Sequence, residues 1–483
     1  MDLEEFRKRG HELVDWMADY FANIESYPVK SQVKPKEIID QLPDYPPETG
    51  EPFERLMSDF ISIIIPGMTH WQHPSYFAYF NANNSYPSVL AEMLTATLGA
   101  QCMIWQTSPA AAELEERVMQ WTGRLIGLPE SFTGVIQDTA STATLCSLLT
   151  AREKFSNFQI NENGFYDQNK YIIYCSGETH SSIEKAVKIA GFGKKNLHKV
   201  TVNEQNALLP GELEKLIIED SGYGFQPMAV VATIGTTGTT AIDPLRKIGE
   251  ICQRYGLWLH VDAAYAGTAL VLPEMRHMID GIEHADTFVF NPHKWMFTNF
   301  DCSAYFVQDK AALIRTFEIM PEYLKTKEDQ RVNNYRDWGI QLGRRFRALK
   351  LWFVIRSFGV QGLRDKIAAH IAWAQELAKR IESSEDFELM APVPLAAIPF
   401  RYHPKQVSGQ PALNQLNARL LDLLNAGGKI YLTHTITDRN YILRLVIGQT
   451  NTEKRHVDNA WMLIKKTAEM TEKQGFRSDT NYQ

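Results

Sequence analysis

Short apolar runs alternate with helical stretches between about residues 134 and 307, and this pattern indicates the fold. The runs expected to form strands are Gly134–Ile136, Tyr171–Cys175, Met228–Thr233, Leu257–Val261, Thr287–Phe290 and Ser303–Val307. Apolar residues at helical spacing lie between several of them, for example in 182–190 and 243–255. Such alternation is typical of a mostly parallel sheet covered by helices, so we expect an α/β fold.

The regions on either side of this pattern have a different character. An amphipathic helix is expected near the N-terminus, where Leu13, Met17, Tyr20 and Phe21 share one face, and a proline-rich link follows it. After a long helical pattern at 346–358, strand-like runs at 398–402, 430–433 and 442–446 mix with helical patterns at 414–425 and 453–471. We therefore expect an N-terminal helical segment (1–85), a large domain (86–358) and a small C-terminal α+β domain (359–483).

Charge and cysteine content narrow the class of protein. The 483 residues carry a net charge of -7, which provides no basic surface for nucleic acid. No apolar run is long enough to span a membrane, and the acidic N-terminal residues are unlike a secretory signal. The five cysteines are scattered without CxxC spacing, which favours reduced thiols over disulfides or a zinc site. We expect a cytoplasmic enzyme without a metal, a membrane or a nucleic-acid partner.

Polar residues follow four of the expected strands at the point where each run ends. They are Gly177–His180, Gly235–Thr237, Asp262 and Asn291–Lys294. Ligands of open α/β sheets bind at the carboxyl ends of the strands. These side chains are therefore expected to meet in one crevice.

Lys294 follows an apolar run and stands between a histidine and a tryptophan. A lysine whose pKa is lowered by burial can form a Schiff base with a carbonyl cofactor, although most lysines at strand ends are only solvated. Asp262 is placed to hold a proton on the ring nitrogen of pyridoxal phosphate. At about 4 Å and an effective dielectric near 20, that ion pair is worth about 4 kcal/mol, or roughly three pKa units.

Three further features fit the same cofactor. Small residues after Asp262, including Ala264, would let a flat ring approach, and His180 could stack on that ring. Thr139 and Ser141 begin an expected helix, whose N-terminal amides suit a phosphate. Taken singly, these residues have ordinary explanations as turn residues, helix caps or hydrogen-bonded loop residues. Their expected convergence at one sheet edge favours the cofactor.

Several longer stretches resemble the pyridoxal-phosphate-dependent aromatic L-amino-acid decarboxylases, a group II decarboxylase family. The similar stretches are Asn291–Trp295, Asn299–Ser303, His260–Gly267, Thr179–Lys185, Trp71, Phe77–Phe80 and Gly343–Arg347, and the likeness covers nearly the whole chain. The resemblance implies a fold-type-I, transferase-like homodimer whose active sites lie at the subunit interface. It also implies a carboxy-lyase activity.

The resemblance assigns roles to individual residues. Lys294 would form the Schiff base, Asp262 would pair with the ring nitrogen and His180 would stack. The phosphate would be held by Thr139, Ala140, Ser141 and Asn291, and His293 and Thr236 would line the cofactor pocket. Tyr335 would return a proton to the substrate from a mobile catalytic loop at about 321–337. Residues 325–334 contain one apolar side chain, which suits a lid or a solvated linker.

The resemblance is less decisive about the substrate. Trp71, Phe80 and His180 would form an apolar wall for an aromatic side chain, although ordinary packing explains most aromatic residues. Ala82 stands where animal members have threonine, and residues 102–104 also differ. We expect decarboxylation of tyrosine, phenylalanine, tryptophan or hydroxylated derivatives to arylalkylamines and CO2. An aromatic aldehyde synthase is the main alternative, since related synthases have phenylalanine in place of the lid tyrosine. A non-catalytic binding protein and a glutamate-directed enzyme fit less well.

Overall fold

The computed structural model describes residues 1–165, 170–319 and 331–473. The chain divides into two compact units. The smaller unit comprises Met1–Asn81, Glu376–Met390 and Phe400–Gln483, and the larger comprises Ala82–Gln375 and Ala391–Pro399. The N-terminal segment and most of the C-terminal region, which we expected to be separate, thus fall within one unit.

Seven strands of the described chain form the sheet of the larger unit, in the order β1-β7-β6-β5-β4-β2-β3. Adjacent strands from β3 to β6 run parallel, whereas β7 is antiparallel to both β6 and β1. This confirms the expected mostly parallel sheet. The strands are β1 (Thr133–Gln137), β2 (Tyr171–Ser176), β3 (Leu197–Val200), β4 (Gln226–Thr233), β5 (Trp258–Asp262), β6 (Thr287–Phe290) and β7 (Ser303–Val307).

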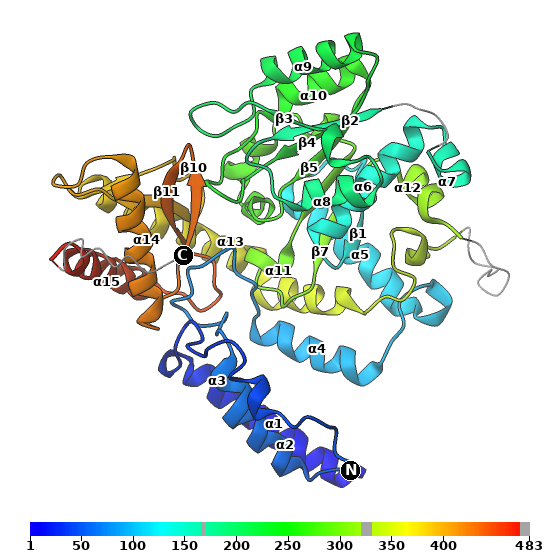
Figure 1. The fold of residues 1–483 in the computed structure, drawn as a ribbon. Coiled ribbons are helices and arrows are strands. Elements are labelled where there is room, and N and C mark those ends of the chain that lie inside the picture. Colours follow the sequence, from blue (N-terminus) through cyan, green and yellow to red (C-terminus); the bar gives the residue numbers. More distant parts are fainter. Residues whose placement is uncertain (166–169, 320–330, 474–483) are drawn as a thin grey trace. The chain divides into compact units, whose positions relative to one another are not determined.

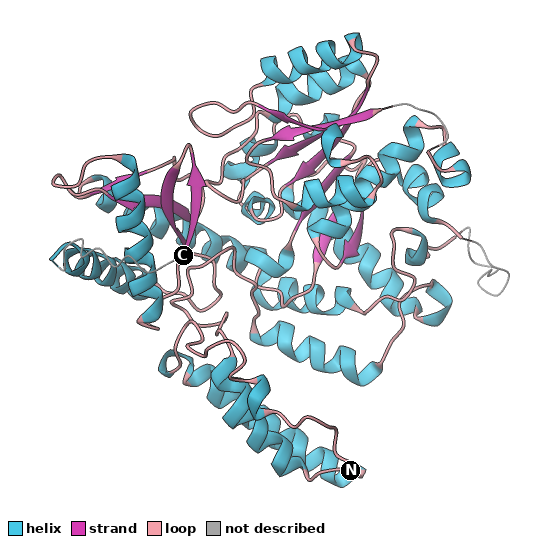
Figure 2. Ribbon diagram, in the orientation of Figure 1, coloured by secondary structure: helices cyan, strands magenta, loops and turns pink. Residues whose placement is uncertain are grey.

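Helices cover both faces of this sheet, which explains why its central strands are apolar throughout (Figures 1 and 2). α6 (Ala140–Phe155) and α8 (Ser182–Ile189) pack together on one face, where Leu148, Ile183 and Ile173 share a core cluster. α9 (Pro210–Gly222) and α10 (Leu245–Tyr255) cover the other face. The unit also contains α4 (Tyr86–Leu98), α5 (Pro109–Ile126), α7 (Gln159–Asn163), α11 (Pro292–Trp295) and α12 (Lys310–Phe317).

The long helix α13 (Arg347–Glu382) is broken at Gly359, whose φ of 64° and ψ of 169° are not helical. The boundary that we expected after Phe358 coincides with this kink. The division between the compact units instead falls later in the helix, after Gln375. The kink is a local change of direction that glycine permits.

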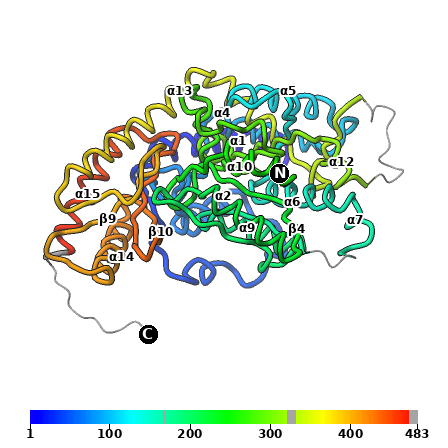
Figure 3. Tube along the Cα trace, turned by 90° about the horizontal axis from the view of Figure 1, so that it is seen from above, coloured from blue at the N-terminus to red at the C-terminus, as the bar shows by residue number. Residues whose placement is uncertain are grey.

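A four-stranded sheet has the order β10-β11-β9-β8, in which β8/β9 and β10/β11 are antiparallel pairs. It belongs to the smaller unit together with the N-terminal helices, except for the first three residues of β9. This confirms the expected C-terminal α+β architecture. α14 and α15 lie against each other beside this sheet (Figure 3). The elements are α1 (Leu3–Ala22), α2 (Phe53–Asp59), α3 (Ile65–Gly67), β8 (Phe387–Leu389), β9 (Ala397–Tyr402), α14 (Gln410–Ala426), β10 (Thr433–Thr437), β11 (Asn440–Val446) and α15 (Lys454–Lys473).

Across the described ranges, no helix is both long and apolar enough to cross a membrane.

Candidate active site

The loops that follow β4, β5 and β6 are bonded to one another at the carboxyl edge of the large sheet. The amide of Ile234 donates to the carbonyl of Asp262 at 2.9 Å, and the amide of Asn291 donates to the carbonyl of Ala264 at 3.0 Å. His180, in the loop after β2, is close enough to Asp262 and Lys294 for both charges to act on its pKa. The structure therefore brings together the acid, the amine and the imidazole that the sequence placed at separate strand ends.

Asp262 and Lys294 are held by the backbone around them. The Asp262 carboxylate is buried and accepts from the amide of Ala264 at 3.0 Å, which fixes the turn after β5. Lys294 is partly buried in the short helix α11, where its amide donates to the carbonyl of Asn291 at 2.9 Å. These contacts fix where each side chain leaves the backbone.

Asn83 is a site-supporting residue that the sequence did not indicate. Its side-chain amide donates to the carbonyl of Lys294 at 2.5 Å, and its backbone amide donates to the carbonyl of His293 at 2.9 Å. Asn83 therefore clamps the turn that carries Lys294. Its position next to Ala82 was the available signal, but nothing in the local pattern linked it to a turn far along the chain.

Small residues in the loops after β4 and β5 have a packing function. A Cβ on Gly267 would lie 2.4 Å from the Cβ of Phe290, and one on Gly235 would lie 2.7 Å from the Cβ of Ala266. Gly235 also has a φ of +82°, which side chains rarely adopt. Glycine at these positions thus lets the loops after β4 and β5 approach their neighbours. Ala264 remains partly exposed and available to a ligand.

His180 is exposed, with its Nδ1 paired to the Ser182 hydroxyl at 2.8 Å. Partial desolvation lowers the pKa of His180; Asp262 raises this pKa and Lys294 lowers it further. The net lowering keeps the imidazole neutral near pH 7. A neutral ring with one fixed edge is suited to stacking.

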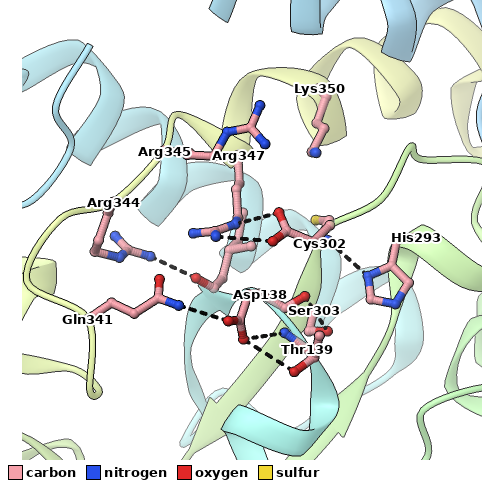
Figure 4. A network of polar contacts seen from close by, with 12 residues as sticks. Asp138, Thr139, His293, Cys302, Ser303, Gln341, Arg344, Arg345, Arg347 and Lys350 are labelled. Carbon is pink, nitrogen blue, oxygen red and sulfur yellow. Dashed lines mark hydrogen bonds and ion pairs between the residues drawn. The ribbon is translucent and has the colours of Figure 1, made fainter. Parts of the chain in front are cut away.

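The start of α6 is the turn at which we expected an anion to bind. Thr139 is its N-cap, and its hydroxyl accepts from the amide of Thr142 at 3.3 Å. The amides of Ala140 and Ser141 belong to the first turn, where no intrahelical acceptor exists. The Ser303 hydroxyl lies 3.3 Å from the carbonyl of Asp138 (Figure 4). It also lies 2.7 Å from the Asn291 Oδ1 and so joins this turn to Asn291.

His293 and Thr236 are both buried and engaged within their own loops. The Nδ1 of His293 accepts from the amide of Cys302 at 2.9 Å, and burial lowers the pKa of His293 to about 3. The hydroxyl of Thr236 accepts from the amide of Ala241 at 3.0 Å. These contacts stabilise the loops around the site, and a direct role toward a ligand remains a prediction for both residues.

The structure corrects the expectation that Tyr335 lies on an open lid. Its side chain is 2% exposed and belongs to a core cluster with Val135 and Trp338. The Arg344 guanidinium lies over its ring at 4.8 Å, and burial raises the pKa of the phenol well above 10. The polar stretch that suggested a lid, residues 325–334, ends directly before Tyr335. From Tyr335 onward the chain packs into the core through Tyr335 and Trp338.

Tyr335 also lies toward the wrong end of the sheet for the expected role. It lines a cavity of about 420 Å³ together with Thr133 and Gly134, the first residues of β1. Asp138 follows the other end of that strand, about 13 Å away at 3.3 Å per residue. Residues 321–330, which make up most of the expected lid, lie outside the described residues.

The expected substrate-pocket residues belong to different units. In the smaller unit, Trp71 stacks on Tyr76 with 4.6 Å between ring centroids, and Arg444 lies 5.3 Å from the ring of Phe80. Ala82 begins the larger unit and is partly exposed, whereas Cys102 and Ile104 are buried within that unit. The substrate-binding roles therefore remain predictions.

This chain is similar to known proteins in both sequence and structure. A tyrosine decarboxylase from Papaver somniferum is 40% identical over 488 residues, covering 96% of this chain and 94% of that protein. A phenylacetaldehyde synthase from Petunia hybrida is also 40% identical, with 97% and 95% covered. The crystal structure of Catharanthus roseus tryptophan decarboxylase in complex with L-tryptophan superposes with a TM-score of 0.92 at 38% identity, covering 98% of this chain and 99% of that one.

The family comparison is consistent with the site geometry. The model of the pyridoxal-dependent decarboxylase conserved domain matches residues 35–403, which include every residue of the site described above. Proteins bind pyridoxal phosphate with a lysine amine, with a carboxylate beside the ring nitrogen and with a helix N-terminus at the phosphate, and this site contains all three groups. This chain belongs to the pyridoxal-dependent decarboxylase family.

Proposed function

We propose that this chain decarboxylates aromatic L-amino acids to arylalkylamines and CO2 with pyridoxal phosphate as its cofactor. The observation that carries the proposal is the joint placement of Lys294, Asp262 and His180 at one sheet edge. This chain belongs to the pyridoxal-dependent decarboxylase family and is 40% identical to a tyrosine decarboxylase over nearly its whole length. Its three side chains are the groups that the reaction needs.

The described residues fit the cofactor by their chemistry. Lys294 would hold it covalently through Nζ, and Asp262 would keep a proton on its ring nitrogen. The turn formed by Thr139, Ala140 and Ser141 would bind its phosphate together with Asn291. When bound, pyridoxal phosphate takes up the electron pair that remains on the α-carbon after CO2 leaves.

His180 acts through its position and its neutral charge. Its lowered pKa means that no positive charge is brought next to the protonated ring that Asp262 maintains. His180 therefore stacks without opposing the ion pair at the ring nitrogen. A cationic side chain at the same place would oppose that pair and weaken the electron sink.

The proton that returns to the α-carbon requires a different donor from the one we first expected. The lid range 321–337 contains two tyrosines, Tyr323 and Tyr335. Tyr335 is fixed in the core of its own chain, so we assign the donor role to Tyr323, which lies outside the described residues. The retained tyrosine favours simple decarboxylation over aldehyde formation.

An aromatic aldehyde synthase is the second candidate function. It is supported by the Petunia hybrida relative, whose identity to this chain equals that of the tyrosine decarboxylase. The same cofactor residues would serve both reactions. The products distinguish them, because the synthase reaction also releases ammonia and hydrogen peroxide.

We further infer that the protein is a cytoplasmic homodimer. α1 has no buried residue, and Leu3, Phe6 and Val14 on it are exposed. α4 exposes Leu90, Leu94 and Leu98. Apolar surfaces of this kind suit burial against a second copy. The five cysteines are all unpaired and buried, which fits a reducing compartment.

The test is incubation of purified protein, loaded with pyridoxal phosphate, with tyrosine, phenylalanine, tryptophan and L-DOPA. Amine, aldehyde, ammonia and peroxide are measured separately. Amine and CO2 in equal amounts are expected. Aldehyde with peroxide would favour the synthase, and no turnover by fully loaded protein would support a non-catalytic role.

A further inference from the structure

Asp138 places a carboxylate directly before the turn that is assigned to the cofactor phosphate. It stands between the last residue of β1 and the N-cap of α6. A negative charge at this place opposes anion binding unless other groups compensate it. The hydrogen bonds of Asp138 indicate a structural role in this turn that offsets its unfavourable charge.

Both carboxylate oxygens of Asp138 are engaged (Figure 4). Oδ1 accepts from the backbone amide of Thr139 at 2.5 Å and lies 3.3 Å from the Thr139 hydroxyl. Oδ2 accepts from the side-chain amide of Gln341 at 2.8 Å. The carboxylate thus joins the phosphate-binding turn to a second segment of the chain.

The segment that carries Gln341 is firmly attached to β1. The side-chain amide of Gln137 donates to the carbonyl of Trp338 at 2.9 Å, and the Arg344 guanidinium donates to the carbonyl of Ile136 at 2.8 Å. Arg344 also forms a buried two-bond ion pair with Glu115, at 2.7 and 3.1 Å. Residues before and after Gln341 are therefore held against β1, so the Gln341 side chain donates from a fixed position.

The charge of Asp138 is partly balanced by Arg347. Asp138 is one of the acids that raise the pKa of the Arg347 guanidinium, although Asp301 contributes more through direct bonds at 2.9 and 3.3 Å. The same neighbourhood contains Arg345 and Lys350 (Figure 4). Both of them form ion pairs with Glu92. We therefore expect Asp138 to affect phosphate binding through the position of the turn and not through its negative charge.

We propose that Asp138 is a positioning residue for the cofactor phosphate, with Gln341 as its anchor. By accepting the Thr139 amide, Asp138 orients the first turn of α6 so that the amides of Ala140 and Ser141 remain for the ligand. This inference rests on the proposed function, because it requires the phosphate to bind at this turn.

The test compares affinities for pyridoxal phosphate and for pyridoxal, which lacks the phosphate, by absorbance titration of the apoprotein. Asp138→Ala is expected to weaken pyridoxal phosphate binding about tenfold and to leave pyridoxal binding unchanged. Asp138→Asn, which keeps an acceptor for Thr139, is expected to bind both within about twofold of the parent. Gln341→Ala is expected to weaken only pyridoxal phosphate binding, by roughly threefold.

Asp309→Ala is the matched control, since Asp309 caps α12 by accepting from the amide of Ala312 at 2.9 Å and is not part of the site. Its ratio of the two affinities should equal that of the parent. Equal pyridoxal phosphate affinity in parent and Asp138→Ala, or an equal loss for both ligands, would overturn the inference. If Asp138→Ala does not fold, an unchanged affinity in Gln341→Ala overturns it. Failure of the parent to bind either ligand would overturn the proposed function as well.

Discussion

The side-chain amide of Asn83 donates to the backbone carbonyl of Lys294 at 2.5 Å and so fixes the turn from which the proposed covalent anchor projects. Asn83→Ala leaves this carbonyl without that donor. We predict a roughly fivefold lower kcat, since a hydrogen bond contributes about 1 kcal/mol. Ser85→Ala, which removes the bond from Ser85 to the carbonyl of Phe297 at 2.8 Å, is the control from the same loop and should lower kcat less. Equal rates for Asn83→Ala and the parent would show that the clamp does not position Lys294.

The two tyrosines of the expected lid range should respond differently to removal of their hydroxyls. Tyr323→Phe is predicted to lower amine formation by about 10²- to 10⁴-fold, the usual contribution of a positioned acid, and to release aldehyde and peroxide. Tyr335→Phe should retain most of the amine activity because its ring packing is unchanged. Separate assays of amine, aldehyde and peroxide distinguish the variants. Aldehyde from Tyr335→Phe but not from Tyr323→Phe would reverse the assignment.

The central strands were predictable because apolar residues continue through them. β2, β6 and β7 are buried along their whole length, so each stands out as an uninterrupted run. β3 escaped prediction because it has four residues and its centre, His198 and Lys199, is polar. β10 begins at Thr433, later than expected, since the apolar residues before it form a loop and the strand itself is rich in threonine.

The positions of Asp262, at the end of β5, and of Lys294, in the short helix after β6, were predictable because both residues follow apolar runs. The roles of Asn83 and Gln341 depend on contacts between segments far apart in the sequence, which no local pattern encodes. Tyr335 was misplaced for a related reason. The composition of residues 325–334 indicates a polar stretch but not where the chain returns to the core.

His260 gives the larger unit a specific pH dependence. It is buried between the hydroxyls of Thr144 and Thr287, and burial lowers its pKa from 6.5 to about 4. The unfolded chain therefore binds the proton first as pH falls, so the His260 contribution to stability is present above pH 6.5 and is lost toward pH 4.

His260→Gln removes this titration and should be less stable than the parent at pH 7. The free energy of unfolding of the parent exceeds that of the variant at pH 7, and this difference is predicted to narrow below pH 6.5 by at most about 1.4 kcal/mol per pH unit. Denaturant unfolding at pH 7, 6 and 5 measures it, with the exposed His277→Gln as control. A difference that stays constant across this range would contradict the prediction.

Ala82 offers a test of substrate preference. Ala82→Thr introduces a hydroxyl at the position where the resemblance to the aromatic-amino-acid decarboxylases implies threonine in animal members. It is predicted to raise kcat/KM for L-DOPA relative to phenylalanine by roughly fivefold, the contribution of one hydrogen bond. Ala82→Val, which has nearly the same shape without the hydroxyl, is the control. The same ratio in both variants would mean that residue 82 does not contact the ring hydroxyls.

The central claim is that the amine of Lys294 holds pyridoxal phosphate. Borohydride reduction of the loaded protein, followed by peptide mass mapping, measures this directly. We predict a reduced pyridoxyl adduct on the peptide that contains Lys294, together with its loss in Lys294→Ala. An adduct on another lysine, or none in protein that shows the absorbance of a bound Schiff base, would contradict the claim.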